Sequence, residues 1–134
     1  FCEFLSSESL YDIVNLKLNI NDSFITVSIR IYKMAVYIKV HNSYRSVVAV
    51  ADSDLLGKRF EEGIKQLDVR ENFYNGKKIE SEEEAIKILK IYLAEDATFN
   101  IVGKEAVNFA VVAGVISEES IGYINNIPYA LKLL

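Results

Sequence analysis

Two kinds of apolar spacing alternate along the chain, and they constrain its fold more than any other feature of the sequence. Apolar residues recur at every second position over 36–40, which predicts a half-buried strand. Turn-forming residues follow at 42–44, so we expect residues 45–51 to return as the second strand of a hairpin. Residues 64–69 predict a third strand.

The second kind of spacing predicts two helices with clear start and stop signals. Ser81 is followed three residues later by Glu84, which is a capping-box pattern that opens a helix. The apolar residues of this helix fall on one face: Ala85, Ile88, Leu89, Tyr92 and Leu93. A second helix is predicted over 104–113, and Gly114 is placed to end it in a left-handed conformation.

Turn-forming pairs and one proline divide the rest of the chain. The Asn-Gly pair at 75–76 predicts a turn, because both residues tolerate positive φ. Residues 52–54 offer capping or turn oxygens ahead of a short helical turn or loop. Residues 121–134 contain two strand-like runs around a turn at 125–126. Pro128 cannot donate to a strand ladder, so its strand is expected to be an edge strand or to begin there.

Together these patterns predict a single α+β domain over residues 34–134. We expect a small antiparallel or mixed β-sheet of roughly four to six strands, with two main helices packed on one side. Apolar residues make up 51% of the chain, which is enough for a real core.

Charge and cysteine content exclude several classes of protein. The formal net charge is −4, so no general attraction for a polyanion is expected. Cys2 is the only cysteine, which excludes an intramolecular disulfide and a cysteine-based metal cluster. No apolar stretch approaches the length of a membrane span and no secretory signal is visible, so we expect a cytoplasmic protein that does not associate with membranes.

Residues 1–33 precede the predicted domain and admit two interpretations. Their composition, rich in Phe, Ile, Leu, Asn, Ser and Lys, is that of an AT-rich leader translated by an over-extended gene prediction. The alternative is an extra β-hairpin, because apolar and polar residues alternate over 16–20 and 25–31 on either side of a turn at 21–22.

Two Gly-Lys pairs raise the possibility of phosphate binding. Gly103-Lys104 lies at the start of the second predicted helix, where free N–H groups and the helix dipole favour an anion. Neither this pair nor Gly57-Lys58 matches a P-loop, because the earlier glycine and the following Ser or Thr are missing. The alternative is that Asn100 simply caps or turns the chain into the helix.

Basic residues stand beside aromatic rings in two places. Lys58-Arg59 precede a phenylalanine, and Phe73-Tyr74 precede a lysine pair at 77–78. An RNA surface combines such cations with stacking rings, so a weak RNA contact through a local basic patch is one hypothesis. Glutamates interleave with these cations, so the alternative is a solvated mixed-charge face whose rings pack in turns or in the core.

Catalytic residue types are present but do not form a set. A catalytic His needs a nucleophile or carboxylate within hydrogen-bond reach, and Ser43, Ser46 and Asp52 form no specific triad with His41. We expect His41 to be a surface residue. The glutamates at 82–84 open a helix, where negative charge complements the dipole. We therefore predict no catalytic residue, no metal site and no cofactor.

Five segments carry a resemblance to a known family. They read VYIKVH (36–41), ADSDLLGK (51–58), FYNG (73–76), NIVGKE (100–105) and IPYA (127–130). In this order and spacing they resemble an archaeal family known as domain of unknown function 424. That family tends to have His where Tyr129 stands and Cys where Ala51 stands, so neither position is expected to be an obligatory catalytic group. The resemblance implies an archaeal cytoplasmic protein with a role near translation or ribosome assembly.

The leading functional hypothesis is a non-catalytic interaction module associated with a ribonucleoprotein or the translation machinery. Its partner would be a protein or a ribonucleoprotein. The candidate binding residues are Lys58, Arg59, Phe73, Tyr74, Asn100, Gly103 and Lys104. The second hypothesis is a small anion- or nucleotide-binding protein with a pocket near the start of the second helix. An undescribed enzyme is the third.

Overall fold

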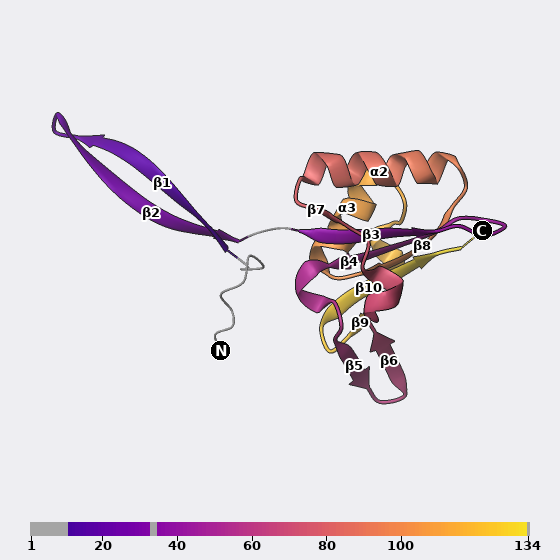
Figure 1. Ribbon diagram of the computed structural model, residues 1–134. Helices are drawn as coiled ribbons and strands as arrows, with labels where there is room; N and C mark the ends of the chain where they lie inside the picture. The colour runs from indigo at the N-terminus through magenta and orange to yellow at the C-terminus, as the bar shows by residue number, and fades with distance from the viewer. Residues whose placement is uncertain (1–10, 33–34, 134) are drawn as a thin grey trace. The chain divides into compact units, whose positions relative to one another are not determined.

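The computed structural model describes residues 11–32 and 35–133 of the chain (Figure 1). These residues belong to two separate units, Phe1–Lys33 and Met34–Leu134. Within the described residues, no helix is both long enough and apolar enough to cross a bilayer.

The first unit contains one antiparallel hairpin, formed by β1 (Tyr11–Ile20) and β2 (Ser23–Tyr32). Asn21 and Asp22 form its turn with φ of 50° and 64°. Positive φ at both central residues is what a type I′ turn requires, and this turn matches the twist of the two strands.

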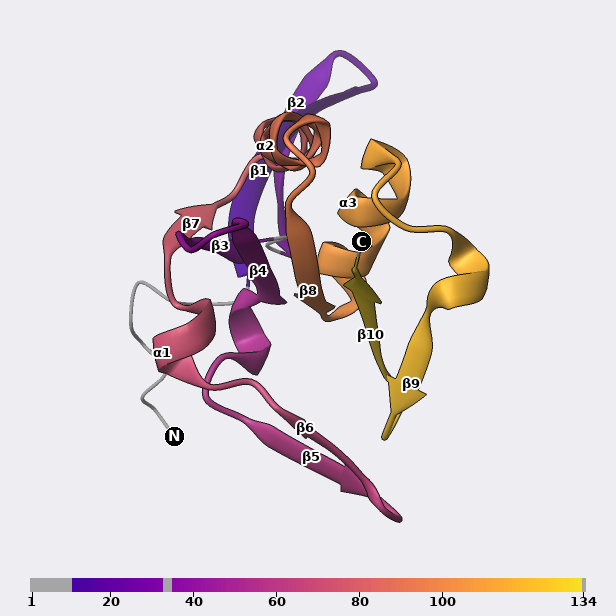
Figure 2. The ribbon, with the colours of Figure 1, turned by 90° about the vertical axis from the view of Figure 1, so that its right-hand side faces the viewer.

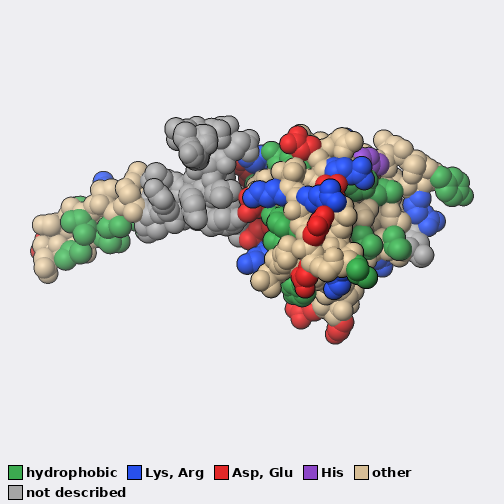
Figure 3. All heavy atoms as spheres, turned by 90° about the horizontal axis from the view of Figure 1, so that it is seen from below, with side chains coloured by type: hydrophobic (Ala, Val, Ile, Leu, Met, Phe, Trp, Pro, Cys, Tyr) green, Lys and Arg blue, Asp and Glu red, His purple; other side chains and the backbone are tan. Residues whose placement is uncertain are grey.

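One face of this hairpin is apolar. Leu16 lies opposite Val27, and Leu18 lies opposite Ile25, so their side chains share a face of the ribbon. Leu18 is 43% exposed and Ile25 is 45% exposed. The space-filling view shows a run of hydrophobic side chains along the hairpin (Figure 3). A two-stranded hairpin of this kind has no core of its own.

The second unit is built on a six-stranded sheet. Its strands are β3 (Val36–His41), β4 (Val47–Asp52), β7 (Lys77–Ile79), β8 (Thr98–Val102), β9 (Gly122–Ile124) and β10 (Ile127–Lys132). Their order in the sheet is β7-β3-β4-β8-β10-β9. Neighbouring strands are antiparallel except β4 and β8, which are parallel, so the sheet is mixed.

Two helices cover one face of this sheet (Figures 1 and 2). They are α2 (Glu82–Ala94) and α3 (Lys104–Ala113). Phe99 of β8 is fully buried in the same core cluster as Leu89 of α2 and Phe109 of α3. This is the predicted α+β fold, and the apolar stripe predicted for α2 faces the core as expected.

Smaller elements cover the opposite face. They are the 3-10 helix η2 (Ser53–Leu55), the short helix α1 (Glu71–Tyr74), and an arm formed by β5 (Arg59–Glu62) and β6 (Lys65–Asp68). Side chains alternate along β4, so Ala49 and Ala51 face this second core while their neighbours face the helices. The strand predicted over 64–69 is β6, but it pairs only with β5 and not with the main sheet.

The arm is tied to the turn between β9 and β10. The Glu62 carboxylate accepts a hydrogen bond from the backbone N–H of Asn125 at 2.7 Å. The side-chain amide of Asn125 donates to the carbonyl oxygen of Glu61 at 2.9 Å. These contacts join segments more than sixty residues apart, which is why the sequence pattern gave no sign of them.

The predicted helix signals are confirmed. The Ser81 hydroxyl accepts a hydrogen bond from the N–H of Glu84 at 3.3 Å, and Gly114 ends α3 with φ of 85°. Asn75 and Gly76 connect α1 to β7 (Lys77–Ile79) without positive φ, and Asn75 has φ of −78°. Gly76 is needed for a different reason. A Cβ there would overlap the backbone of β3 at Ile38.

Candidate functional site

The start of α3 is formed by Gly103, between the end of β8 and the first helical residue, Lys104. Gly103 has φ of 110°, a conformation that residues with a side chain rarely adopt. Its N–H donates to the carbonyl oxygen of Pro128 at 2.8 Å, and its own carbonyl oxygen accepts from Val107 at 2.9 Å. These bonds fix the direction in which α3 leaves the sheet.

Asp52 caps α3 from a distant part of the chain. One carboxylate oxygen accepts from the N–H of Ala106 at 2.8 Å, and the other accepts from the N–H of Glu105 at 3.2 Å. Residues 52–54 were expected to supply capping oxygens to the turn that follows them, but the Asp52 side chain makes no such bond in η2. It satisfies the free N–H groups of α3 instead.

Burial dominates the electrostatics of this carboxylate. Asp52 is only 6% exposed. Desolvation raises the pKa of its carboxyl from the ordinary 3.8 to about 7, and the two N–H bonds oppose that rise only in part. The nearby charges of Asp54 and Glu105 add to the increase in pKa.

The interpretation of Asn100 as the cap of this helix is wrong. Asn100 lies inside β8, where it pairs with Ala49 of β4 and with Leu131 of β10. The helix begins four residues later, and Asp52 supplies the capping oxygens.

Phe73 and Tyr74 belong to α1 and pack within the domain. The Phe73 ring stacks on the His41 ring with ring centres 4.5 Å apart. The backbone carbonyl oxygen of Phe73 lies 2.8 Å from Nε2 of His41. Tyr74 is buried and meets Phe73 edge-on at 5.0 Å. Burial raises the pKa of Tyr74 to about 12, with a smaller contribution from the charge of Asp68. Neither ring therefore offers two free faces to a nucleic-acid base.

The basic candidates lie among acidic side chains. The Arg59 guanidinium is 3.1 Å from the Glu61 carboxylate, and the Lys77 ammonium is 3.3 Å from that of Glu84. Lys58 joins η2 to the arm through backbone bonds to Leu55 and Val69. Figure 3 shows basic and acidic side chains interleaved on the face that it presents. Apart from Gly103 and Lys104, the candidates from the sequence therefore lie outside α3. Lys58 and Arg59 lie at the base of the arm, Phe73 and Tyr74 lie in α1, and Asn100 lies in β8.

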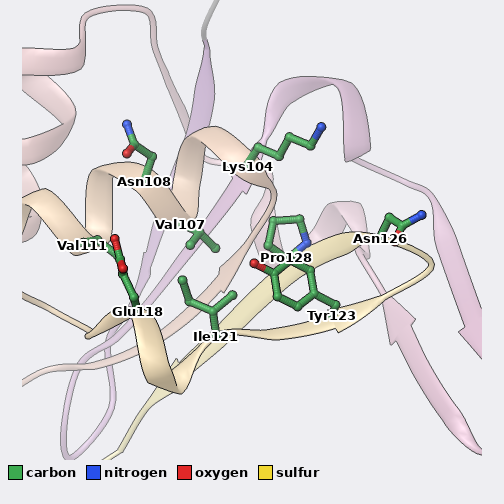
Figure 4. Close-up of a pocket in the computed structure, with 9 residues that line it drawn as sticks. All are labelled: Lys104, Val107, Asn108, Val111, Glu118, Ile121, Tyr123, Asn126 and Pro128. Atoms are coloured by element: carbon green, nitrogen blue, oxygen red, sulfur yellow. The ribbon is translucent and has the colours of Figure 1, made fainter.

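A hollow of about 530 Å³ lies beside α3, and it is called the α3 hollow below (Figure 4). It is bounded by one face of α3, by the 3-10 helix η3 (Glu118–Ser120) and by the β9–β10 hairpin. Its lining residues are Lys104, Val107, Asn108, Val111, Glu118, Ile121, Tyr123, Asn126 and Pro128. Its volume is within the range of ordinary ligand-binding clefts.

Polar groups without a protein partner surround the apolar floor of this hollow. Within residues 35–133, five of the lining side chains form no hydrogen bond or ion pair: Lys104, Asn108, Glu118, Tyr123 and Asn126. Val107 and Pro128 are buried between them. Of these residues only Lys104 was a candidate from the sequence. The spacing of 104, 107, 108 and 111 marks one helix face, but no local pattern indicates that β9 and β10 lie against it.

His41 and Asp52, which were considered for a catalytic set, each have a structural partner. His41 contacts Phe73, and Asp52 caps α3. In the part of the chain that the structure describes, no group of three or more His, Cys, Asp or Glu residues could hold a metal ion.

Comparison with known proteins gives two matches. The model of the family described as "Protein of unknown function (DUF424)" matches residues 40–133. The crystal structure of an uncharacterized conserved protein from Methanopyrus kandleri is similar, with 27% sequence identity and a TM-score of 0.65, over 72% of this chain and 89% of that one. No curated protein matches the chain. The family match lies within the second unit, which contains the α3 hollow.

Proposed function

From the premise that the chain belongs to the DUF424 family, we propose that it is a non-catalytic interaction module that binds a segment of another protein in the α3 hollow. The observation that carries this proposal is the set of unpartnered polar side chains around a buried apolar floor. Binding sites combine an apolar lining with a few polar groups that fix the orientation of the ligand.

Protein is a better match to this surface than a phosphate-bearing ligand. Among the described residues, Lys104 is the only cation that lines the hollow, and Glu118 places a negative charge in its lining. The N–H groups of Glu105 and Ala106, which would otherwise favour an anion, already donate to Asp52. A small anion or nucleotide would therefore be repelled by the Glu118 carboxylate. It would also lack the N–H donors that the N-terminus of a helix usually offers, because Asp52 already accepts from them.

A ribonucleoprotein or a component of the translation machinery is the source that we propose for the bound protein segment, following the expectation from sequence. The amide groups of Asn108 and Asn126 support a protein ligand, because an amide can both donate to and accept from a peptide backbone. The weak RNA contact expected from Lys58 and Arg59 is not supported, because the Arg59 guanidinium already forms an ion pair with the Glu61 carboxylate.

Co-sedimentation of the full chain with ribosomal subunits at moderate salt tests this proposal. Asn108→Trp would fill the hollow from an exposed helix position without changing the core. Val112→Trp is the matched control, because Val112 is 54% exposed on the same helix but does not line the hollow. We expect the wild type and the control to sediment with the subunits and Asn108→Trp to stay in the supernatant. Equal sedimentation of the two variants would contradict the site, and failure of the wild type to sediment would contradict the partner.

A further inference from the structure

The α3 hollow has charges of opposite sign at its two ends. Lys104 lies at the first residue of α3, and Glu118 lies in η3, beyond the end of the helix. Figure 4 shows the two side chains at opposite ends, with Val107 and Ile121 between them. Neither charge has an ion-pair partner within residues 35–133. A ligand that spans the hollow therefore meets a positive end, an apolar middle and a negative end.

The length of the hollow sets how much peptide it can hold. Lys104 and Val111 are seven residues apart on α3, which corresponds to about 10 Å along the helix axis. An extended peptide rises about 3.3 Å per residue, so its first and fifth side chains are separated by about 13 Å. In an extended chain the first, third and fifth side chains point to the same side. An extended segment of about five residues is thus long enough to follow α3 from Lys104 past Val111.

On this basis we propose that the α3 hollow recognises an extended segment of a partner protein with the pattern acidic-x-apolar-x-basic. The acidic side chain lies at Lys104, the apolar side chain contacts Val107 and Ile121, and the basic side chain lies at Glu118. The amides of Asn108 and Asn126 bind the peptide backbone. This inference rests on the proposed function and adds to it the sequence pattern of the bound segment.

The two charges determine which charge pattern binds more than how tightly it binds. Exposed ion pairs contribute little to binding, whereas like charges brought together are strongly unfavourable. A segment with acidic residues at both ends would place one of them against Glu118, and a segment with basic residues at both ends would place one of them against Lys104. The hollow is therefore selective for a segment whose two ends carry opposite charges.

Fluorescence anisotropy with the full chain and labelled, end-capped peptides tests this proposal. The mixed-charge peptide has the core Glu-Ser-Leu-Ser-Lys, an acidic peptide has Glu-Ser-Leu-Ser-Glu, and a third peptide has Glu-Ser-Ser-Ser-Lys. We expect the mixed-charge peptide to bind about tenfold more tightly than the acidic one, a difference of about 1.4 kcal/mol. The peptide without Leu should bind about tenfold more weakly than the mixed-charge peptide, because it leaves the apolar floor uncovered.

Charge-changed variants provide the decisive comparison. The double substitution Lys104→Glu with Glu118→Lys keeps one charge of each sign at exposed positions, so it should keep the preference for the mixed-charge peptide. Glu118→Lys alone makes both ends of the hollow basic, so it should reverse the preference and bind the acidic peptide more tightly. An unchanged preference in Glu118→Lys, binding that persists in Asn108→Trp, or displacement of the peptide by a single-stranded RNA oligonucleotide would each overturn the inference. If no peptide binds but Asn108→Trp still abolishes co-sedimentation, the recognition pattern is wrong and the proposed function stands.

Discussion

The carboxylate of Asp52 occupies the space that a side chain on Gly103 would need. Asp52 is the last residue of β4, and Gly103 is the N-cap of α3. A Cβ built on Gly103 would overlap all three atoms of the Asp52 carboxylate. The buried acid and the glycine therefore depend on each other, because only glycine allows the carboxylate to reach the N–H groups of the helix.

Gly103→Ala should destabilise the domain by about 3 kcal/mol or more, because it adds a steric overlap to an unfavourable φ. Gly114→Ala is the matched control at the other end of α3. Gly114 also has positive φ, at 85°, but nothing lies within 4 Å of a Cβ there. Gly114→Ala should lower the free energy of unfolding by about 1 to 2 kcal/mol. Urea unfolding measures both values, and equal losses would show that the overlap with Asp52 is unimportant.

The pH dependence of stability should report the buried carboxyl of Asp52. Its pKa is about 7 in the folded protein against 3.8 ordinarily, so the folded state holds a proton that the unfolded state has released between these pH values. The contribution of the Asp52 carboxyl to the free energy of unfolding is at its full value below about pH 4. It is lost as the pH rises through 7. The free energy of unfolding should fall by about 2 to 3 kcal/mol between pH 5 and pH 8.

Asp52→Asn separates this contribution from that of the other carboxylates. The amide cannot titrate, so the variant should lack the fall between pH 5 and pH 8 that the wild type shows. Urea unfolding of both proteins at the two pH values is the measurement. Parallel pH profiles for the wild type and the variant would mean that Asp52 is ionised in the folded state throughout this range.

The N-terminal cap of α2 should contribute about 1 kcal/mol. Ser81→Ala removes the hydroxyl that accepts the N–H of Glu84, and that N–H is then left without its partner. Ser117→Ala is the control, since Ser117 precedes η3 but its side chain makes no capping bond. Its effect should stay within about 0.5 kcal/mol. Thermal or urea unfolding distinguishes the two, and similar losses would show that the Ser81 cap is dispensable.

His41 should hold α1 against β3. His41→Ala removes the stacking on Phe73 and the bond to its carbonyl oxygen, at a cost of about 1 to 2 kcal/mol. Tyr44→Ala is the control on the same hairpin, because Tyr44 is fully exposed. Hydrogen exchange at the N–H of Asn75, which bonds Glu71 across α1, should accelerate in His41→Ala only. Unchanged exchange there would exclude this role.

Local chemistry explains which parts of the fold were predictable. The Ser81 cap, the apolar stripe of α2 and the left-handed Gly114 depend on residues within one or two turns of one another. Strand alternation around β3 is local in the same sense. Such features are present in the sequence before any tertiary contact forms.

The site was predictable only in part, because it is formed by contacts between distant segments. Lys104 was marked as a candidate, but the Asp52 carboxylate that caps its helix comes from more than fifty residues away. Glu118 and Asn126 had no local signal, since their role depends on the packing of η3 and the β9–β10 turn against α3.

The sequence by itself determined the types of the main elements, the ends of α2 and α3, and the apolar face that α2 buries. Only the tertiary structure decided that β4 and β8 lie parallel, that β5 and β6 leave the main sheet, and that Asp52 caps α3. The physical reason is that periodicity and capping are set by neighbours along the chain. Strand order and the burial of a carboxylate are set by which distant surfaces exclude water together.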